Sequence, residues 1–358
     1  LVLPSDIELV KLKVGKVDAP NLAVTALGCD SGRPLAGEEL LFHCEVSNFS
    51  TLPRQTTVFF NAQETRSSRE ISLPPHGKAT LVFKQKFQTQ GLYPVKVSLA
   101  EDSFPGDDSR VLCVSVAQYL NAAVVSGDKA TAELWKKALE ALGWVRVETL
   151  SEQELSGELP YDFILLSGWQ GGGAGRLASK LKDGAAVLCM PALGLELEKI
   201  LVLAGEGAAA RTQQPFAFAK ADSPLKLRIT APDDSVFKLF SGGELVNPVS
   251  GSFTGRILNP SPNWLPRSAE QLLAFDDGQP ALARFRAGKG ALLLWLMPLG
   301  RDCSTWQAQP GFLPFLSELL LASRASSHAL LEQQPGEELV LKVNHDTILS
   351  DITLQDES

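Results

Sequence analysis

The sequence feature that most constrains this fold is a change in hydrophobic periodicity near Tyr119. Before that point, from Asn21 to Val116, apolar and polar residues alternate in short runs, which is the period of a half-buried β-strand. After it, short apolar runs are followed by longer stretches with helical spacing. The sequence therefore predicts an all-β unit over residues 1–118 and an α/β unit that begins at residue 119.

The first unit shows about seven short strands at a spacing of ~8 to 12 residues, which is typical of an antiparallel sandwich. Turn signals stand at Leu73–Gly77 and at Phe104–Asp108. In such turns Pro fixes φ, and Gly or Asp accepts the positive-φ positions. We therefore expect a β-sandwich in which these two segments connect neighbouring strands.

The second unit alternates strands with helices. Strands are expected at residues 121–126, 145–147, 161–167 and 185–190, and helices at 131–142 and 176–182. On the first of these helices Ala132, Trp135 and Leu139 fall on one face. Strands and helices that alternate at this length predict a parallel, doubly wound sheet.

The order is less regular further along the chain. Residues 201–279 contain many Pro, Gly and Asp and predict an irregular insertion with a few strands. Strands at 281–285 and 291–297 and a helix at 312–322 then close the α/β unit, which we expect to end at residue 326. Residues 327–358 alternate again and predict the start of a further β-segment or a truncated domain.

Length and charge exclude several classes of protein. The 358 residues predict two or three domains, and 44% apolar with 21% charged residues is typical of a soluble globular chain. A net charge of -8 and a pI near 5.2 argue against a nucleic-acid partner, which needs clustered Lys and Arg. The longest apolar run, 291–299, is about half of the ~20 residues that a membrane-spanning helix needs. Because the sequence opens with Leu1 and shows no signal pattern, we expect it to come from a longer protein.

The five cysteines show no CxxC spacing, which excludes the usual zinc and thioredoxin signatures. They are Cys29, Cys44, Cys113, Cys189 and Cys303. Cys44 and Cys113 both fall in expected strands of the first unit, so a disulfide between them is one alternative. Small buried apolar side chains are the other, and they fit free cysteine better.

A glycine-rich segment, Gly171–Gly175, follows the third strand of the α/β unit and invites a test for phosphate binding. A GxGxxG motif that starts at Gly171 has Arg176 in place of its last glycine. A GxxxxGK motif that starts at Gly168 has Ala174 in place of its lysine. We therefore expect a plain loop and no nucleotide cofactor.

Cys189 ends the fourth strand, where an amidotransferase-type fold carries its nucleophile. A catalytic thiolate needs a base, usually His. None of the chain's four histidines, which are His43, His76, His328 and His345, lies between Tyr119 and Arg324. A nucleophile elbow also needs small residues, whereas Met190 and Pro191 follow directly. We therefore expect a buried structural cysteine and no catalytic residue.

Paired carboxylates at 107–108, 233–234 and 276–277 have oxygen ligands of the kind that Ca²⁺ takes. None has the DxDxDG spacing, so we expect Asp-rich turns and no metal site. Trp264, Trp295 and Trp306 are expected to pack in the core or between domains.

Several short motifs, in this order, carry a resemblance to a known family. They are Asn21-Leu-Ala-Val-Thr-Ala-Leu, Val46-Ser-Asn-Phe, Leu73-Pro-Pro-His-Gly, Gly106-Asp-Asp-Ser-Arg, Asp277-Gly-Gln-Pro-Ala-Leu, Gly288-Lys-Gly-Ala-Leu-Leu-Leu and Gly311-Phe-Leu-Pro-Phe-Leu. Together they resemble the extracytoplasmic region of bacterial aerotolerance (Bat-type) proteins that have an N-terminal double-transmembrane segment.

The resemblance implies a fold, a location and partners. It implies an immunoglobulin-like, adhesion-type sandwich followed by a glutamine-amidotransferase-like domain of flavodoxin type. It places the chain on the periplasmic face of the bacterial inner membrane, anchored by helices outside this sequence, and makes other envelope or membrane proteins its partners. It implies no activity. No Asp-x-Ser-x-Ser motif for metal-dependent adhesion is present in the sequence.

We therefore expect a non-catalytic interaction or structural module with a pseudoenzyme α/β domain. One alternative is a hydrolase or amidotransferase that uses Cys189, with His328 reaching across as its base. The other is a small-ligand sensor that uses the crevice at the carboxyl ends of the parallel strands. The residues expected around that crevice are Asp128, Ser167, Gly168, Trp169, Cys189 and Pro191.

Overall fold

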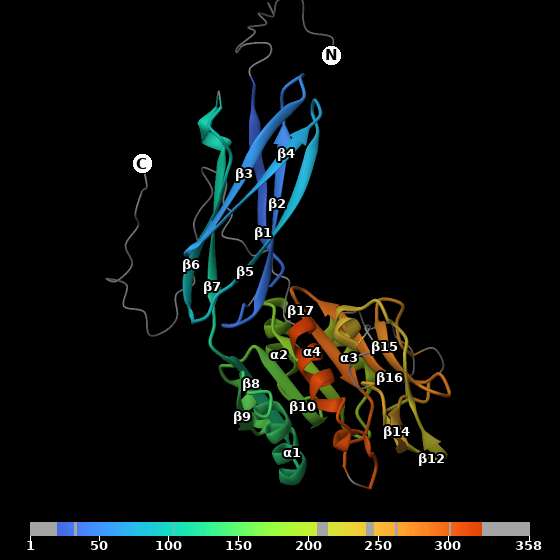
Figure 1. Ribbon diagram of the computed structural model, residues 1–358. Helices are drawn as coiled ribbons and strands as arrows, with labels where there is room; N and C mark the ends of the chain where they lie inside the picture. Colours follow the sequence, from blue (N-terminus) through green and yellow to red (C-terminus); the bar gives the residue numbers. More distant parts are fainter. Residues whose placement is uncertain are drawn as a thin grey trace, which may run out of the picture.

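The computed structural model describes residues 20–31, 34–102, 104–205, 214–240, 247–261, 264–300 and 302–323. It consists of two units, an elongated β-sandwich and a broader unit built on a mixed sheet, with the sandwich standing on one side of that sheet (Figure 1). The expected β-segment at 327–358 lies outside the described residues. No described helix is long and apolar enough to cross a membrane.

The first unit is a seven-stranded antiparallel sandwich, as the alternation predicts. Its strands are β1 (Leu22–Cys29), β2 (Glu39–Asn48), β3 (Arg54–Ala62), β4 (Thr65–Leu73), β5 (Lys78–Lys86), β6 (Gly91–Ser98) and β7 (Ser109–Val116), with the short helix η1 (Pro105–Asp107) between the last two. One sheet has the order β1-β2-β5 and the other β4-β3-β6-β7. Every second residue of β2, including Phe42 and Cys44, is buried. Phe60 and Phe83 stack across the two sheets with ring centroids 4.8 Å apart.

The two cysteines of the sandwich that could have formed a disulfide are both free. Cys44 lies on the buried face of β2, and burial raises the pKa of its thiol to about 12. Cys113 lies on β7, in the other sheet, and is exposed. Because Cys44 faces the core and Cys113 faces solvent, no disulfide joins them. The interpretation as a small buried side chain is right for Cys44 and wrong for Cys113, which is exposed.

A link of only three residues joins the two units. β7 ends at Val116 and the next strand begins at Leu120. Ala117 donates its N–H to the carbonyl of Pro34 (2.9 Å), and its own carbonyl accepts the N–H of Ala36 (2.8 Å). The link is thus hydrogen-bonded back to the sandwich.

The second unit is built on an eight-stranded sheet with the order β13-β15-β16-β17-β11-β10-β8-β9. Its strands are β8 (Leu120–Ser126), β9 (Val145–Leu150), β10 (Phe163–Trp169), β11 (Ala186–Pro191), β13 (Leu227–Ile229), β15 (Glu270–Phe275), β16 (Pro280–Ala287) and β17 (Gly290–Trp295). Five neighbouring strands, from β9 to β17 in that order, are parallel. The other three pair antiparallel, so the expected all-parallel sheet is wrong for this half.

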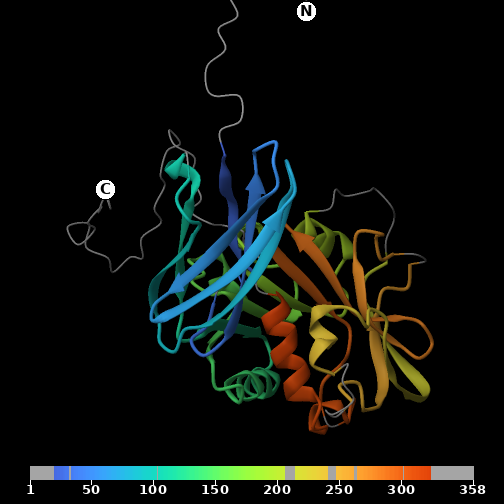
Figure 2. The ribbon, with the colours of Figure 1, turned by 45° about the horizontal axis from the view of Figure 1, so that its top comes forward.

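Helices cover both faces of the sheet (Figure 2). They are α1 (Lys129–Glu140), α2 (Ala174–Lys182), α3 (Leu197–Ala204) and α4 (Phe312–Ser323), with short 3₁₀ helices η2 (Glu152–Ser156), η3 (Ser235–Phe240) and η4 (Trp306–Ala308). On one face an aromatic cluster joins α1 and α4 to β17. Trp135 meets Trp295 edge to face at 5.4 Å, and Trp306 stacks on Trp295 at 5.3 Å. Trp295 and Trp306 are core residues, as expected.

The described part of the segment expected to be an irregular insertion contains four strands, two of which belong to this sheet. β13 and β15 extend the sheet at its antiparallel edge. Only β12 (Ala217–Leu225) and β14 (Phe253–Leu258) form a separate two-stranded sheet. The sequence predicted a few strands here but not that two of them join the main sheet, because short strands between turns leave little periodic signal.

A charged network fastens η3 to the antiparallel strands. Arg284 of β16, only 12% exposed, pairs with Asp234 and with Glu270. The guanidinium contacts Asp234 through two of its nitrogens. This fork geometry suits Arg and is the stronger kind of ion pair.

Candidate functional site

The topology of the parallel strands places a candidate site at the ends of β8 and β10. The chain runs from β8 through α1 to β9 on one side of β8, whereas β10 and β11 lie on its other side. The strand order therefore reverses between β8 and β10. In doubly wound sheets ligands bind in the crevice outside the carboxyl ends of the strands at such a reversal.

A cavity of about 370 Å³ lies at this point. Its lining consists of Ser126, Gly127, Asp128, Thr131, Ser167, Gly168, Met190, Pro191, Ala192, Leu193, Phe218, Ile257, Pro298, Leu299 and Cys303. Of the six residues expected around the crevice, four line the cavity: Asp128, Ser167, Gly168 and Pro191. Trp169 and Cys189 do not, since both are buried behind it.

Asp128 closes the first turn of α1 as its N-cap. Its Oδ2 accepts the backbone N–H of Thr131 at 2.8 Å and the Thr131 hydroxyl at 2.5 Å. These hydrogen bonds lower the pKa of the Asp128 carboxyl. A carboxylate that caps a helix and stays ionised acts as a fixed acceptor, so Asp128 is poorly placed to take protons as a base.

Ser167 and Gly168 shape the end of β10. The Ser167 side chain is buried, and its hydroxyl contacts the thioether sulfur of Met190 at 3.9 Å. Gly168 has φ +72°, a left-handed conformation that turns the chain out of the strand and that glycine adopts without strain. A weak acceptor is thus the only hydrogen-bond partner of the Ser167 hydroxyl among the described residues, which leaves Ser167 without a base to activate it.

The glycine-rich loop that follows is occupied by the chain's own carboxylate. Glu152 of η2 accepts the backbone N–H groups of Gln170 and Gly172, the latter at 2.5 Å. The indole N–H of Trp169 donates to the carbonyl of Gly172 at 2.8 Å and closes the loop. Free N–H groups of this kind would bind an anion. Because an internal carboxylate takes that place, the loop has no need of a phosphate ligand.

Cys189 lies in the middle of the sheet, paired with Leu166 on β10 and Leu294 on β17. Its side chain is fully buried. Burial, and to a lesser degree the charge of Glu152, raises the pKa of its thiol far above the usual range. A thiol of this kind is inert as a nucleophile.

Several lining residues were missed from the sequence, and most of them are apolar. Phe218 and Ile257 come from β12 and β14, which lie in the segment expected to be irregular. Leu193 and Leu299 come from loops. Leu193 and Phe218 are exposed at the mouth of the cavity. Short amphipathic strands and loop leucines give no sequence signal for a shared site, so only the fold could have revealed them.

A larger cavity, of about 1050 Å³, lies elsewhere. Residues 258–261 and 264–267 line it together with Gln271, Gln279 and Pro280, and Arg267 is the one charged residue among the described residues of the lining. It is far along the sheet order from the reversal between β8 and β10. Size alone does not make a site, and we give greater weight to the crevice because the strand reversal and an apolar lining coincide there.

Comparison with known proteins does not identify a function for this site. No protein-family model matches the chain, and no curated protein matches it. Among solved structures it is similar to a cytoplasmic protein from Salmonella typhimurium, with 11% identity and a TM-score of 0.43 over 57% of this chain and 99% of that one.

Two further similarities differ in how much of the chain they cover. The CARDB domain of a Pyrococcus furiosus protein, described in complex with di-metal ions, has 16% identity and a TM-score of 0.26 over 29% of this chain and 99% of that one. A Thermoplasma acidophilum protein described as a GMP synthase subunit has 14% identity and a TM-score of 0.36 over 58% of this chain and 95% of that one. At such low identities and TM-scores these similarities carry no argument about function.

Proposed function

We propose that this chain is a non-catalytic interaction module of a membrane-anchored bacterial envelope protein. In it the α/β unit is an amidotransferase-like pseudoenzyme, and the immunoglobulin-like sandwich is a spacer or docking surface for other envelope or membrane proteins. The observation that carries the proposal is the burial of Cys189 within the sheet.

The argument from Cys189 is one of access and of acid–base chemistry. Nucleophilic attack requires a thiolate that meets the substrate, and an adjacent base or a depressed pKa to form it. Cys189 lies on a central strand with its side chain fully buried, and burial raises its pKa. The two described histidines, His43 and His76, both belong to the sandwich. His43 is paired there with Asp30 at 2.5 Å.

The envelope location rests on the resemblance and on the order of the units. A sandwich followed by an α/β unit is the order that the resemblance implies, and the described units follow one another in that order. The test is protease digestion of intact spheroplasts that express the full-length parent protein with a C-terminal tag. Digestion of the region by external protease is expected. Protection until the inner membrane is lysed would contradict the location and leave the fold unaffected.

The pseudoenzyme is tested by mapping cysteine alkylation in the native protein across pH. Iodoacetamide labelling, quantified for each cysteine peptide by mass spectrometry, should be fast at the exposed Cys113 and negligible at Cys189 until urea unfolds the chain. Cys44 is the matched buried control, and Cys189→Ser identifies the signal. Labelling of Cys189 faster than Cys113 near neutral pH would revive the enzyme hypothesis and would call for a test of His328.

A second candidate, a small-ligand sensor, is favoured by the apolar crevice at the strand reversal. Two phenylalanines of nearly equal exposure allow a matched test: Phe218 at the crevice (42%) and Phe59 on the sandwich (41%). If the crevice takes apolar ligands, Phe218→Ser should weaken binding of an anilinonaphthalene sulfonate dye several-fold, and Phe59→Ser should leave it unchanged. Equal effects of the two variants would exclude the crevice as the binding site.

A further inference from the structure

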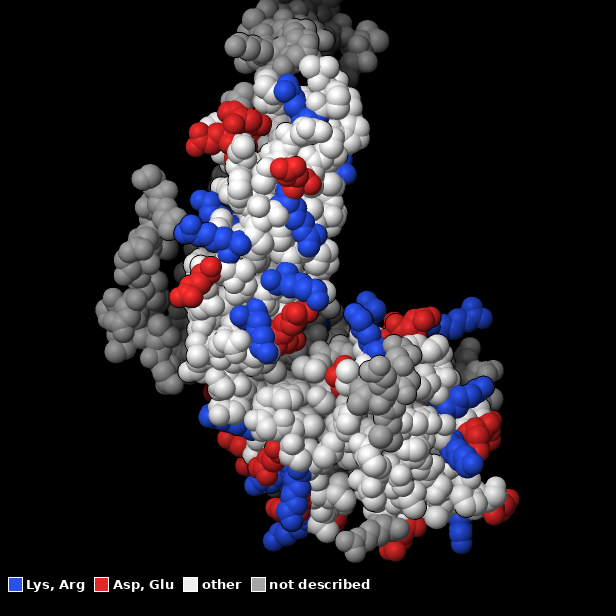
Figure 3. Space-filling view, viewed as in Figure 1, with Lys and Arg blue, Asp and Glu red and all other residues white. Residues whose placement is uncertain are grey.

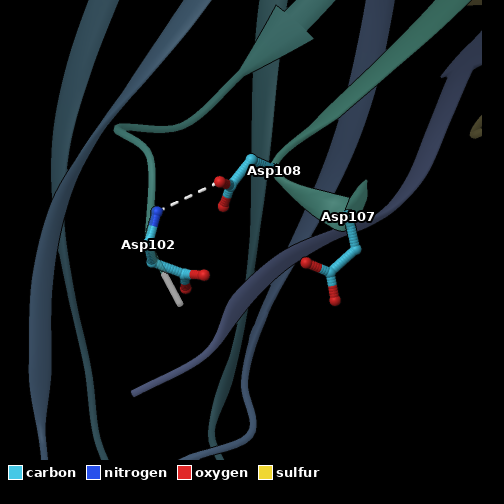
Figure 4. Close-up of side chains that lie close together, drawn as sticks. All are labelled: Asp102, Asp107 and Asp108. Carbon is cyan, nitrogen blue, oxygen red and sulfur yellow. Dashed lines mark hydrogen bonds between the residues drawn. The ribbon is translucent and has the colours of Figure 1, made fainter. Parts of the chain in front are cut away.

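Three aspartates gather at the end of the sandwich that lies farthest from the mixed sheet. Asp102, Asp107 and Asp108 belong to the connection between β6 and β7, which includes η1. One carboxylate oxygen of each lies within 4.8 Å of the others. Figure 3 shows acidic side chains grouped over η1, and Figure 4 shows the three carboxylates around a common space. Sequence spacing hid this cluster, because Asp102 stands apart from the pair at 107–108.

Backbone and amide donors fix the orientation of the three carboxylates. Asp107 and Asp108 each accept through Oδ2, whereas Asp102 accepts through both oxygens, because the N–H of Phe104 donates to its Oδ1 at 2.8 Å. The N–H of Leu22 donates to Asp102 Oδ2 at 2.6 Å, and the N–H of Asp102 donates to Asp108 Oδ2 at 3.1 Å. The side-chain amide of Asn21 donates to Asp107 Oδ2 at 3.1 Å. The cluster is thus held in place by the start of β1 as well as by its own loop.

The remaining oxygens are what distinguish the cluster from an ordinary acidic turn. Asp108 is only 5% exposed, and its Oδ1 is buried without a hydrogen-bond donor among the described residues. Asp107 Oδ1 and Asn21 Oδ1 are likewise buried without a described donor. A buried acceptor without a partner is costly, and in native proteins it usually marks a bound ion or water.

The charges around these oxygens are of one sign. Asp102, Asp107 and Glu101 are the charged groups that act on Asp108, and all three are negative. None of the three clustered aspartates forms an ion pair with a described Lys, Arg or His. A cation is therefore the missing electrostatic partner.

We propose that Asp102, Asp107, Asp108 and the side-chain oxygen of Asn21 form a calcium site. Ca²⁺ takes six to eight oxygen ligands at about 2.3–2.6 Å, so any two ligands of one ion lie within about 5 Å. The oxygens of the three aspartates satisfy that limit, and Asn21 contacts the cluster through its hydrogen bond to Asp107. All four side chains offer oxygen, the ligand of hard cations, and none offers the sulfur or imidazole that Zn²⁺ favours. Water and backbone carbonyls would complete the shell.

The ion would fasten the β6–β7 connection to the start of β1. Asn21 and Leu22 stand where the chain enters the sandwich, and both already contact the cluster. The site is distant from the crevice and does not depend on the function proposed for it.

The first experiment is isothermal titration of the metal-free chain with CaCl₂, with Asp107→Asn, Asp108→Asn and Glu101→Gln as variants. Glu101 is exposed, adds charge near the site and is not a ligand, so it is the matched control. We expect one ion per chain, binding at least about tenfold weaker in both Asn variants, and nearly unchanged binding in Glu101→Gln. Absence of binding up to about 10 mM Ca²⁺, or equal weakening in all three variants, would overturn the proposal.

Calorimetric melting separates loss of the site from loss of the fold. In EGTA the Asn variants should melt at or above the temperature of the parent chain, because each removes one of three mutually repelling charges. In Ca²⁺ the order should reverse, since only the parent gains the full binding energy. Asn variants that melt below the parent by the same amount in both buffers would show a purely structural role and refute the site.

Discussion

The three tryptophans of the aromatic cluster provide a matched test of how a buried N–H affects stability. Trp135, Trp295 and Trp306 are all fully buried. The indole N–H of Trp306 donates to the carbonyl of Pro248, and that of Trp295 to the carbonyl of Met297, both at 2.8 Å. The indole N–H of Trp135 has no acceptor among the described residues. Replacement of each by Phe removes the same N–H group, which is hydrogen-bonded in Trp295 and Trp306 and unsatisfied in Trp135.

The expected free energies of unfolding follow from two terms. The smaller phenyl ring leaves a small cavity that costs about 2 kcal/mol at each position. In Trp135→Phe this cost is offset by removal of an unsatisfied donor, worth about 1–3 kcal/mol. In Trp306→Phe a buried carbonyl is instead left unsatisfied, which adds about 1–3 kcal/mol. Trp135→Phe should therefore be nearly neutral, and Trp306→Phe should be more destabilising by at least about 2 kcal/mol.

Urea unfolding followed by tryptophan fluorescence isolates the relevant unit, because all six tryptophans lie after residue 118. With a slope of about 2–3 kcal/mol/M, a difference of this size separates the two midpoints by about 1 M. Trp295→Phe should behave like Trp306→Phe. Equal costs at positions 135 and 306, with unchanged slopes, would refute the reasoning and would mean that the Trp135 N–H is satisfied in solution.

Three further predictions concern charge, backbone conformation and pH. Arg284→Leu should lower the free energy of unfolding by about 3–5 kcal/mol, because it leaves the largely buried Asp234 carboxylate without its cation. Arg286→Leu, at a side chain 80% exposed, should change it by less than about 0.5 kcal/mol in the same urea assay. Gly173→Ala and Gly194→Ala both place Ala at positive φ, but only at Gly173 would the new Cβ lie 2.5 Å from another side chain. Chemical denaturation should therefore show that Gly173→Ala lowers the free energy of unfolding by about 1–3 kcal/mol more than Gly194→Ala. Equal decreases would contradict the steric argument. Burial raises the pKa of Tyr161 to about 12. The stabilisation that comes from this raised pKa is complete below pH ~10 and is lost as the pH rises from about 10 to 12. Tyr161→Phe should flatten the decrease of the urea midpoint over this pH range, and an unchanged decrease would refute the assignment.

Much of the architecture could be predicted from periodicity, and the failures have physical causes. Alternation predicted about seven sandwich strands, although β4 is mostly exposed and does not alternate. Apolar runs such as residues 291–297 predicted the central strands, because strands buried on both faces are continuously apolar. The antiparallel half of the sheet could not be predicted. β13 and β15 are short, and their pairing depends on contacts distant in sequence.

The candidate site was predicted only in part, because the sequence locates strand ends but not the pairing of short strands. Asp128, Ser167, Gly168 and Pro191 follow strand ends, and strand ends can be located from the sequence. Trp169 and Cys189 do not line the cavity, because Trp169 is buried at the end of β10 and Cys189 lies two residues before the end of β11. The apolar wall came from β12 and β14, which the sequence did not place near the crevice.

The three-residue link between the units has a mechanical consequence. Ala117 is hydrogen-bonded to the sandwich on one side, and β8, which begins at Leu120, is held by strands on both of its edges. A pull on the sandwich would therefore reach β8 along its own axis and load the hydrogen bonds to β9 and β10 together, in shear. Bonds that share a load in this way resist it better than bonds that open one at a time. The two units are therefore expected to move together under tension and not to rotate about the link.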